Sequence, residues 1–119
     1  MTHDPNCIFC KIVAGQIPSR KVYEDDLVYA FHDIHPVAPV HLLVIPKDHV
    51  TSMSDLDTRH EPAMGRMMVV AQRLAQDAGS TDGFRTIVNT GRVGRQEVMH
   101  LHMHVLGGKE ALPPMLVRV

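Results

Sequence analysis

The sequence predicts one α+β domain, residues 1–119, with an antiparallel five-stranded sheet, one main helix and a short N-terminal helix. A stretch between residues 61 and 78 carries apolar residues at helical spacing, while several short apolar runs have the composition of strands. The chain has 119 residues, of which 45% are hydrophobic and 21% are charged. This length and composition are typical of a single globular core.

The N-terminal part predicts a short helix at residues 8–13, which follows an extended polar tail at residues 1–6. Gly15 and Pro18 end the helix, because glycine tolerates a positive φ and proline lacks a backbone donor. The apolar side of this helix is expected to consist of Ile8, Phe9, Ile12 and Val13.

Residues 21–34 predict two strands, because acidic residues at positions 24–26 interrupt an apolar run and make a hairpin the simplest fit. Residues 41–45 form a continuous apolar run that Pro46 closes. Since this run does not alternate with polar residues, the strand is expected to be buried on both faces and to lie centrally in the sheet.

The main helix is predicted from apolar residues that recur every three or four positions and stop before Gly79. Asp57 is one candidate for its N-cap, whereas Pro62 favours a start near Glu61, with the proline in the first turn. The last two strands are predicted at residues 84–89 and 99–106, and an extended tail is predicted at residues 113–119. The apolar positions of the helix are Met64, Met67, Met68, Ala71, Leu74, Ala75 and Ala78.

Charge and hydropathy exclude two classes of partner. The formal net charge of −1 provides no uniform field that would attract a nucleic acid polymer or an anionic membrane. No apolar run approaches the roughly 20 residues needed to span a bilayer, and the N-terminus lacks the pattern of a secretory signal. We therefore expect a cytoplasmic protein with neither nucleic acid nor a membrane as its partner.

The strongest chemical signal is the alternation of histidine between residues 100 and 104. Side chains two residues apart on a strand share a face, so His100, His102 and His104 are expected side by side, while the apolar residues between them face the core. Imidazole is used where its charge change or its two distinct nitrogens are needed. Two other interpretations stay open: a half-exposed strand that uses histidine as its polar residue, and a metal site.

Three segments together resemble the histidine-triad (HIT) nucleotide-binding family, and specifically its Hint-like branch. The resemblance runs from about residue 8 to about residue 114. It implies the HIT-like fold, a two-fold homodimer that joins the two sheets into one, and activity on nucleoside monophosphates linked to a leaving group. The segments are His100-Leu101-His102-Met103-His104-Val105-Leu106, Phe31-His32-Asp33-Ile34-His35-Pro36 and His41-Leu42-Leu43-Val44-Ile45-Pro46-Lys47-Asp48-His49.

The resemblance implies a reaction centre formed by His41 and the triad histidines His100, His102 and His104, with His102 as the nucleophile. A neutral nitrogen of His102 would attack the α-phosphorus and form a nucleotidyl-histidine, while its other ring nitrogen donates to an acceptor such as a backbone carbonyl. His104 and His41 match positions near the phosphate, where they bind a non-bridging oxygen or pass a proton to the leaving amine. The division of these two roles stays open.

The resemblance also implies a nucleoside pocket in which apolar groups hold the base and the Asp33 carboxylate accepts from ribose hydroxyls. Asn89, Gln96 and Glu97, together with His102 and His104, match positions near the phosphate and sugar. The remaining pocket positions are Ile8, Phe9, Ile17, Phe31, His32, Ile34 and Leu43.

The run Gly94-Arg95-Gln96-Glu97 departs from the Gly-Gly-Gln-Ser or Gly-Gly-Gln-Thr run of many family members. Position 97 has no hydroxyl to bond the phosphate, and a carboxylate there is repelled by phosphate unless it points away. Arg95 places a cation where those members have a flexible glycine. Contact of Arg95 with the leaving group and a solvated position on the surface both stay open.

Cys7 and Cys10 form a Cys-x-x-Cys pair, which in a reducing compartment is typical of metal or redox chemistry. From the cysteines alone, a buried apolar pair or a surface redox pair is an equal alternative. A subset of histidine-triad proteins joins such a pair to two histidines, here His49 and His100. The resemblance thus implies a closed Cys₂His₂ zinc site with a structural role, and no organic cofactor.

The implied function is that of a hydrolase or transferase which cleaves P–N or P–O bonds at the α-phosphate of nucleoside monophosphate derivatives. Purine nucleoside phosphoramidates, as AMP or GMP derivatives, are the expected substrates. Two alternatives stay open: a nucleotide-binding partner protein with little turnover, and a dinucleotide polyphosphate hydrolase of the same family. Gln96 and the Gly107-Gly108 pair favour the Hint-like branch over the latter.

Overall fold

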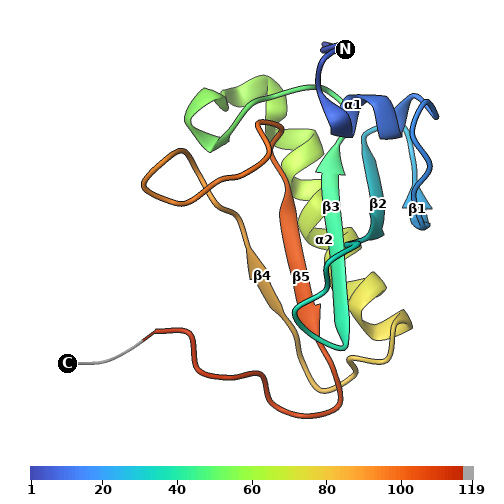
Figure 1. The fold of residues 1–119 in the computed structure, drawn as a ribbon, viewed down its shortest axis with the longest axis vertical. Helices are drawn as coiled ribbons and strands as arrows, with labels where there is room; N and C mark the ends of the chain where they lie inside the picture. Colours follow the sequence, from blue (N-terminus) through green and yellow to red (C-terminus); the bar gives the residue numbers. More distant parts are fainter. Residues whose placement is uncertain (117–119) are drawn as a thin grey trace.

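A five-stranded antiparallel sheet forms the centre of the molecule (Figure 1). The computed structural model describes residues 1–116. The strands lie in the order β1-β2-β3-β5-β4, and each neighbouring pair is antiparallel, which confirms the predicted sheet. Their bounds are Lys21–Glu24 for β1, Val28–His32 for β2, Val40–Pro46 for β3, Arg85–Ile87 for β4 and Met103–Gly107 for β5.

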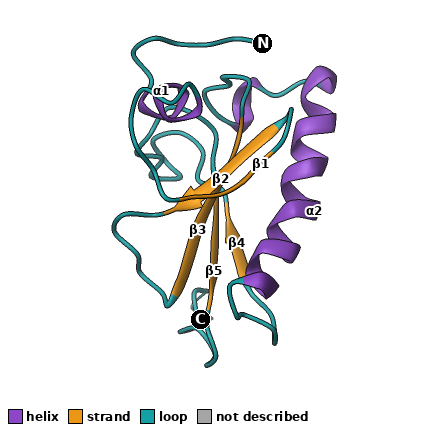
Figure 2. Cartoon of the chain, turned by 90° about the vertical axis from the view of Figure 1, so that its right-hand side faces the viewer, coloured by secondary structure: helices purple, strands orange, loops and turns teal. Residues whose placement is uncertain are grey.

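The two α-helices lie on opposite sides of the sheet (Figure 2). Helix α2, Glu61–Asp77, covers one face, and the short helix α1, Ile8–Val13, lies on the other side (Figure 2). Two 3₁₀ turns, Met53–Asp55 and Thr58–His60, precede α2. This arrangement creates a larger core between the sheet and α2 and a smaller one beneath α1.

Strand β3 is the central strand of the sheet and is buried along its whole length, as its continuous apolar run predicts. Leu42 and Val44 contribute to the core beside α2, while Leu43 and Ile45 contribute to the core beneath α1. The predicted hairpin is also confirmed. Its turn is held by Asp25, whose Oδ1 accepts hydrogen bonds from the backbone of Leu27 and Val28 at 2.8 and 2.9 Å.

Helix α2 begins at Glu61 with Pro62 in its first turn, as predicted, and ends before Gly79, whose φ is +101°. Asp57 caps the preceding 3₁₀ turn instead, where its Oδ1 accepts from the Arg59 backbone N–H at 2.9 Å. The methionines of α2 do not form one surface. Met67 is buried in the core, whereas Met68 is 60% exposed.

The last two strands are shorter than the sequence predicts. Strand β4 covers only three residues of the predicted 84–89, and β5 begins at Met103 rather than near residue 99. The reason for the late start is that β3 ends at Pro46, which has no N–H to donate. The backbone N–H of Leu101 donates instead to the carbonyl of Val50 at 2.8 Å.

The expected alternation survives this change, because Leu101, Met103 and Val105 are all buried in the core beside α2. The histidines lie on the other side, but they do not form a half-exposed strand. His100 is completely buried and His102 is 6% exposed, and the Phe9 ring of α1 lies against both. The interpretation of these histidines as solvated polar residues of a strand is therefore wrong.

The chain termini have no helix or strand at residues 1–6 and 113–116; residues 117–119 of the predicted second tail lie outside the described residues. The N-terminal tail is nevertheless anchored, since the backbone N–H of His49 donates to the carbonyl of Thr2 at 2.8 Å. Among residues 1–116, no helix combines the length and apolar character needed to cross a bilayer.

Candidate active site and metal-binding cluster

A cavity of about 290 Å³ opens beside the start of α1 and the start of β5. Asp33, directly after β2, and Leu43 of β3 contribute to one side of it, and the connection between β4 and β5 contributes to the other. The cavity is lined by Phe9, Asp33, Leu43, Asn89, Arg95, Glu97, Val98, His102 and His104.

His102 lines this cavity with a defined tautomer. Its Nδ1 lies 2.8 Å from the carbonyl oxygen of His100, and because a carbonyl only accepts, Nδ1 carries the proton. The Phe9 ring packs edge-on against the imidazole at a centroid distance of 5.3 Å and restrains its orientation. The Nε2 of neutral His102 therefore keeps a free lone pair, which is what a nucleophile requires.

His41 and His104 form a second, directly bonded unit in which the proton positions can also be assigned. The Nδ1 of His41 accepts from the backbone N–H of Val37 at 3.1 Å, so the proton of neutral His41 is on Nε2. This Nε2 lies 2.9 Å from Nδ1 of His104 and 3.4 Å from Oδ2 of Asp33. Because Nε2–H of His41 donates to Nδ1 of His104, Nδ1 of His104 carries no proton. The proton of neutral His104 is therefore on Nε2, from which it can donate a hydrogen bond to a ligand.

Burial keeps both of these histidines neutral near pH 7. It lowers the pKa of His41, and the nearby Asp33 carboxylate opposes this only partly. Burial also lowers the pKa of His104 to about 4, with further lowering by the charges of His102 and His41. Asp33, His41 and His104 also present three possible metal-ligand atoms. A metal bound to Nε2 of His41 would force the ring proton onto Nδ1, where it would clash with the Val37 N–H that donates to this nitrogen.

We expect the His104→Asn variant to be less sensitive to acid than the wild-type protein. Because the pKa of folded His104 lies below its unfolded value near 6.5, the unfolded chain binds more protons, and stability is lost as pH falls from about 6.5 to about 4. The contribution of His104 to this loss is on the order of 2 to 3 kcal/mol. Urea unfolding at pH values from 7 to 4.5 measures it.

The matched control for this experiment is His35→Asn, which removes an exposed histidine from the loop after β2. The control should lose stability with falling pH as steeply as the wild-type protein does. If His104→Asn did the same, burial of a neutral His104 would not be the source of the acid sensitivity.

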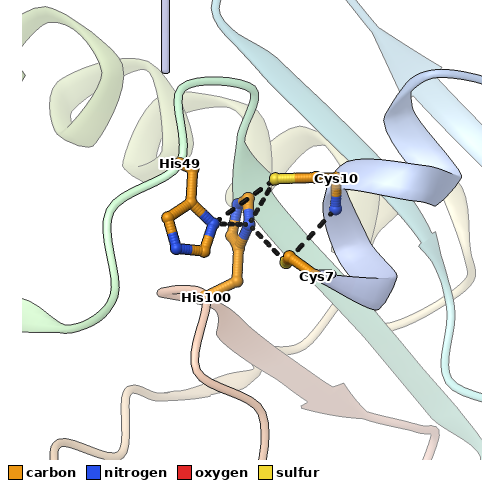
Figure 3. Close-up of side chains that lie close together, drawn as sticks. All are labelled: Cys7, Cys10, His49 and His100. Carbon is orange, nitrogen blue, oxygen red and sulfur yellow. Dashed lines mark hydrogen bonds between the residues drawn. The ribbon is translucent and has the colours of Figure 1, made fainter. Parts of the chain in front are cut away.

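The two cysteines and two histidines form a separate cluster, in which His49 is half-buried and the other three side chains are buried (Figure 3). Cys7 and Cys10 come from the start of α1, His49 from the loop after β3, and His100 from the segment before β5. The Nδ1 of His100 lies 3.3 Å from Sγ of Cys7, 3.6 Å from Sγ of Cys10 and 3.2 Å from Nδ1 of His49. Sγ of Cys10 lies 3.3 Å from Nδ1 of His49.

The tautomer of His100 suits a metal ligand. Its Nε2 lies 2.8 Å from the carbonyl of Pro46, so the proton of the neutral ring is on Nε2 and the lone pair of Nδ1 faces the cluster. Burial lowers the pKa of His100 to about 4, which keeps that lone pair available. The sequence predicts His100 as one of the catalytic residues, but it does not line the cavity; it reaches His102 only through its backbone carbonyl.

The structure brings together five of the expected nucleotide-binding residues besides the histidines: Phe9, Asp33, Leu43, Asn89 and Glu97 line the cavity. It does not bring the others to its wall. Phe31 packs in the core beneath α1 and Ile17 packs against it, while Ile8 and Ile34 are 47% and 81% exposed.

Two expected side chains have other positions. His32 lies beside Phe31 on β2, and neighbouring strand residues face opposite ways, so His32 lines a hollow against α2 with Leu42 and Leu74. Gln96 is buried and holds the loop before β5: its Oε1 accepts from the Gly91 backbone, and its Nε2 donates to the carbonyls of Thr51 and Val98.

Two lining residues, Arg95 and Val98, are absent from the predicted nucleotide-binding set. Arg95 could have been found from its departure from the family run. Val98 gives no such signal, because it is one apolar residue in a segment without regular structure.

Comparisons with known proteins agree with this fold. Residues 14–111 match the HIT domain family. The chain is 52% identical to the purine nucleoside phosphoramidase of Escherichia coli (strain K12) over 110 residues, which are 92% of each chain. A histidine triad protein from Clostridium difficile superposes with a TM-score of 0.90 at 47% identity, over 97% of this chain and all of that one.

A further solved relative is a zinc-bound histidine triad family protein from Mycobacterium smegmatis. It has a TM-score of 0.76 and 36% identity, over 86% of this chain and 74% of that chain. Since the family match covers most of the sequence and the Escherichia coli relative aligns over 92% of its length at 52% identity, this chain belongs to the HIT domain family.

Proposed function

We propose that this protein hydrolyses purine nucleoside phosphoramidates and related nucleoside monophosphate derivatives through a nucleotidyl-histidine intermediate on His102. The observation that carries the proposal is the fixed tautomer of His102, whose Nδ1 donates to the His100 carbonyl while its Nε2 keeps a lone pair beside the cavity. The activity named for the Escherichia coli relative supports the same reaction class.

The nucleoside is proposed to bind at the side of the cavity that Asp33, Leu43 and Phe9 form. Phe9 and Leu43 offer an apolar surface for the base. The Asp33 carboxylate already accepts from the His35 backbone N–H at 2.7 Å, which orients it, and its remaining lone pairs can accept from ribose hydroxyls. None of these contacts is specific for adenine or guanine, so AMP and GMP derivatives are both proposed substrates.

The first chemical step forms a bond between Nε2 of His102 and the α-phosphorus. The bond from phosphorus to the leaving nitrogen breaks, its electron pair stays on that nitrogen, and the departing amine takes up a proton from solvent. In our proposal Nε2–H of neutral His104 donates a hydrogen bond to a non-bridging phosphate oxygen and keeps its proton, while Nε2–H of His41 fixes this tautomer by donating to Nδ1 of His104.

The second step regenerates the enzyme. Water attacks phosphorus, the bond to Nε2 of His102 breaks with its electron pair on Nε2, and the nucleoside monophosphate is released. The proton of the water passes to solvent, which balances the proton taken up by the amine in the first step. The hydrogen bond from Nδ1 of His102 to the His100 carbonyl is retained throughout and stabilises the positive charge that the phosphorylated ring carries.

The test is brief mixing with adenosine 5′-phosphoramidate, followed by acid quenching, peptide digestion and mass spectrometry. A nucleotidylated peptide that contains His102, together with steady-state release of AMP, is expected. Binding of AMP without an adduct and without turnover would instead favour a nucleotide-binding partner protein. Faster cleavage of a dinucleotide polyphosphate than of the phosphoramidate would instead favour a dinucleotide polyphosphate hydrolase.

We also propose that Cys7, Cys10, His49 and His100 hold a structural zinc ion. Around a tetrahedral zinc with bonds of about 2.0 to 2.3 Å, neighbouring ligand atoms lie about 3.3 to 3.8 Å apart, and the spacings in the cluster approach these values. Four ligands leave no position for a catalytic water, so the ion would stabilise the fold. Both thiols are free, which suits the reducing cytoplasm in which we propose that the protein works.

We propose that the chain forms a two-fold homodimer through β4 and α2. Within residues 1–116, strand β4 is at the edge of the sheet and pairs only with β5, while Met68 and Val69 of α2 are 60% and 64% exposed. A self-complementary contact would cover both features at once.

Light scattering at micromolar concentration is expected to return about twice the chain mass of 13.3 kDa. The Val69→Lys variant should shift the mass toward that of a monomer, whereas Gln72→Lys, on an exposed turn of the same helix, serves as the control for added charge. A stable wild-type mass near that of one chain would contradict the dimer.

A further inference from the structure

The loop that precedes the triad is a tightly built segment. The backbone N–H groups of Gly94, Arg95 and Gln96 donate to the carbonyls of Thr90, Arg92 and Gly91 at 2.9 to 3.1 Å. A Cβ at Gly94 would lie 2.5 Å from the Thr90 oxygen, so the loop closes as tightly as glycine permits. The position of Arg95 is therefore fixed by its surroundings.

Arg95 has a φ of +60°, in the left-handed region that favours glycine. Among residues 1–116, every other residue with a positive φ is a glycine. An arginine here costs conformational free energy that glycine would avoid, and such residues concentrate at functional sites. The backbone thus indicates that the arginine side chain has a use.

The surroundings of Arg95 leave its charge available. It is exposed, and within the part of the chain that the structure describes it forms no ion pair, including none with Glu97 in the same loop. It nevertheless lines the cavity that contains His102 and His104. A guanidinium at that wall offers five donors to an anion.

Arg95 lies on the side of the cavity opposite to the proposed nucleoside-binding side. Strand β5 lies between β3 and β4, so Asp33 and Leu43 approach the histidines from one side, and the β4–β5 connection that carries Arg95 approaches from the other (Figure 1). If the nucleoside binds beside Asp33, as in the proposed function, the group beyond the scissile bond extends toward Arg95.

We propose that Arg95 is a specificity-determining residue that binds an anionic group on the leaving group of the substrate. This inference rests on the proposed function. A leaving amine that carries a carboxylate would pair with the guanidinium through charge-assisted hydrogen bonds, whereas a neutral leaving amine would leave that charge in solvent. The contact selects among substrates that share the same nucleotide.

The test uses two adenosine 5′-phosphoramidates, one of β-alanine and one of its neutral amide, which differ in charge but hardly in size. The Arg95→Gln variant should lower the ratio of kcat/KM for the carboxylate over the amide by about fivefold. Arg95→Lys should retain most of the ratio. Because the wild-type and variant ratios are compared, the different basicity of the two amines cancels.

Arg92→Gln is the matched control, because Arg92 is an exposed cation of the same loop that does not line the cavity. It should leave the ratio unchanged. An equal fall for both substrates in Arg95→Gln would show that the arginine binds the phosphate common to them and would overturn the inference. An unchanged ratio would overturn it as well.

Binding separates this inference from the proposed function. In a His102→Asn background, calorimetry of the same two compounds gives a ratio of Kd values without any turnover. If the wild-type protein cleaved neither compound, the proposed function would fail, yet a fivefold effect of Arg95→Gln on the Kd ratio would still support the role of Arg95. No effect on either ratio would refute it.

Discussion

The His102→Asn variant is expected to lose turnover by at least about 10⁴-fold while it binds AMP within about threefold of the wild-type affinity. The loss follows because asparagine has no nitrogen lone pair to attack phosphorus. Asparagine is preferred to alanine, since its amide N–H can replace the hydrogen bond from Nδ1 of His102 to the His100 carbonyl. Initial rates with adenosine 5′-phosphoramidate and calorimetry with AMP measure the two effects.

Asp33→Ala supplies the contrasting variant. A ribose acceptor contributes to ground-state binding as well as to the transition state, so this change should weaken AMP binding more than it lowers kcat. The comparison is informative because both residues line one cavity. Near-normal rates in His102→Asn would refute the covalent mechanism even if AMP still bound.

The elements that the sequence predicts best are those whose cause is local. Helix α2 has apolar residues at helical spacing, a proline at its start and a glycine beyond its end, and its observed bounds follow these signals. Strand β3 is predicted to be central because its apolar run does not alternate, and it is buried along its length. In both cases the pattern reflects surroundings that stay the same along the whole element, with one buried face for α2 and two buried faces for β3.

The start of β5 could not be predicted in this way, because it depends on contacts with residues that are distant in the sequence. Residues 99–102 alternate like a strand, yet Leu101 bonds to Val50 and His100 faces cysteines that are more than 80 residues away in the sequence. The alternation of apolar and polar residues indicates which face of the strand each side chain lies on, but it does not indicate which residue the backbone is hydrogen-bonded to. The predicted faces are therefore right and the predicted boundary is wrong.

The predicted nucleotide-binding residues show what a family resemblance can and cannot predict. It identifies Asp33 and Asn89, which line the cavity from opposite sides. It also includes His32, whose side chain lines a hollow against α2. Strand alternation by itself places the side chains of Phe31 and His32 on opposite faces, whereas the buried hydrogen bonds of Gln96 leave no signal in the sequence.

The Cys/His cluster and His102, the proposed nucleophile, are coupled through a single residue. His100 directs Nδ1 toward Cys7, Cys10 and His49, and its backbone carbonyl accepts from Nδ1 of His102. An ion that fixes the His100 side chain would therefore also fix the acceptor that sets the tautomer of the nucleophile. Its effect on catalysis would be exerted through position, without Lewis acidity at the phosphate.

Protein purified without a metal-affinity tag is expected to contain about one zinc per chain, and the Cys7→Ser and Cys10→Ser variants are expected to contain little. Removal of the ion should lower the stability by on the order of 3 kcal/mol or more, which for a chain of this size corresponds to a fall in Tm of at least about 10 °C. Elemental analysis and thermal unfolding measure the two quantities.

Cys7→Ser is the sharper variant because Cys7 has two roles. Its Sγ is close to His100, and it also caps α1 by accepting from the Cys10 backbone N–H at 3.4 Å. Serine is a preferred N-cap residue, so this variant removes a zinc ligand while it keeps the start of the helix. A fall in Tm in this variant therefore reports on the metal and not on the cap.

Chelation tests the same site in the wild-type protein. A strong chelator should lower the Tm of the wild-type protein to about that of Cys7→Ser and should leave the variant unchanged, because the variant has no ion to lose. Turnover should fall in parallel, since the His100 carbonyl that orients His102 is no longer held. Metal-free protein whose Tm and turnover are unaffected by chelation would show that the four side chains pack together without an ion, and that the tautomer of His102 is set by the fold alone.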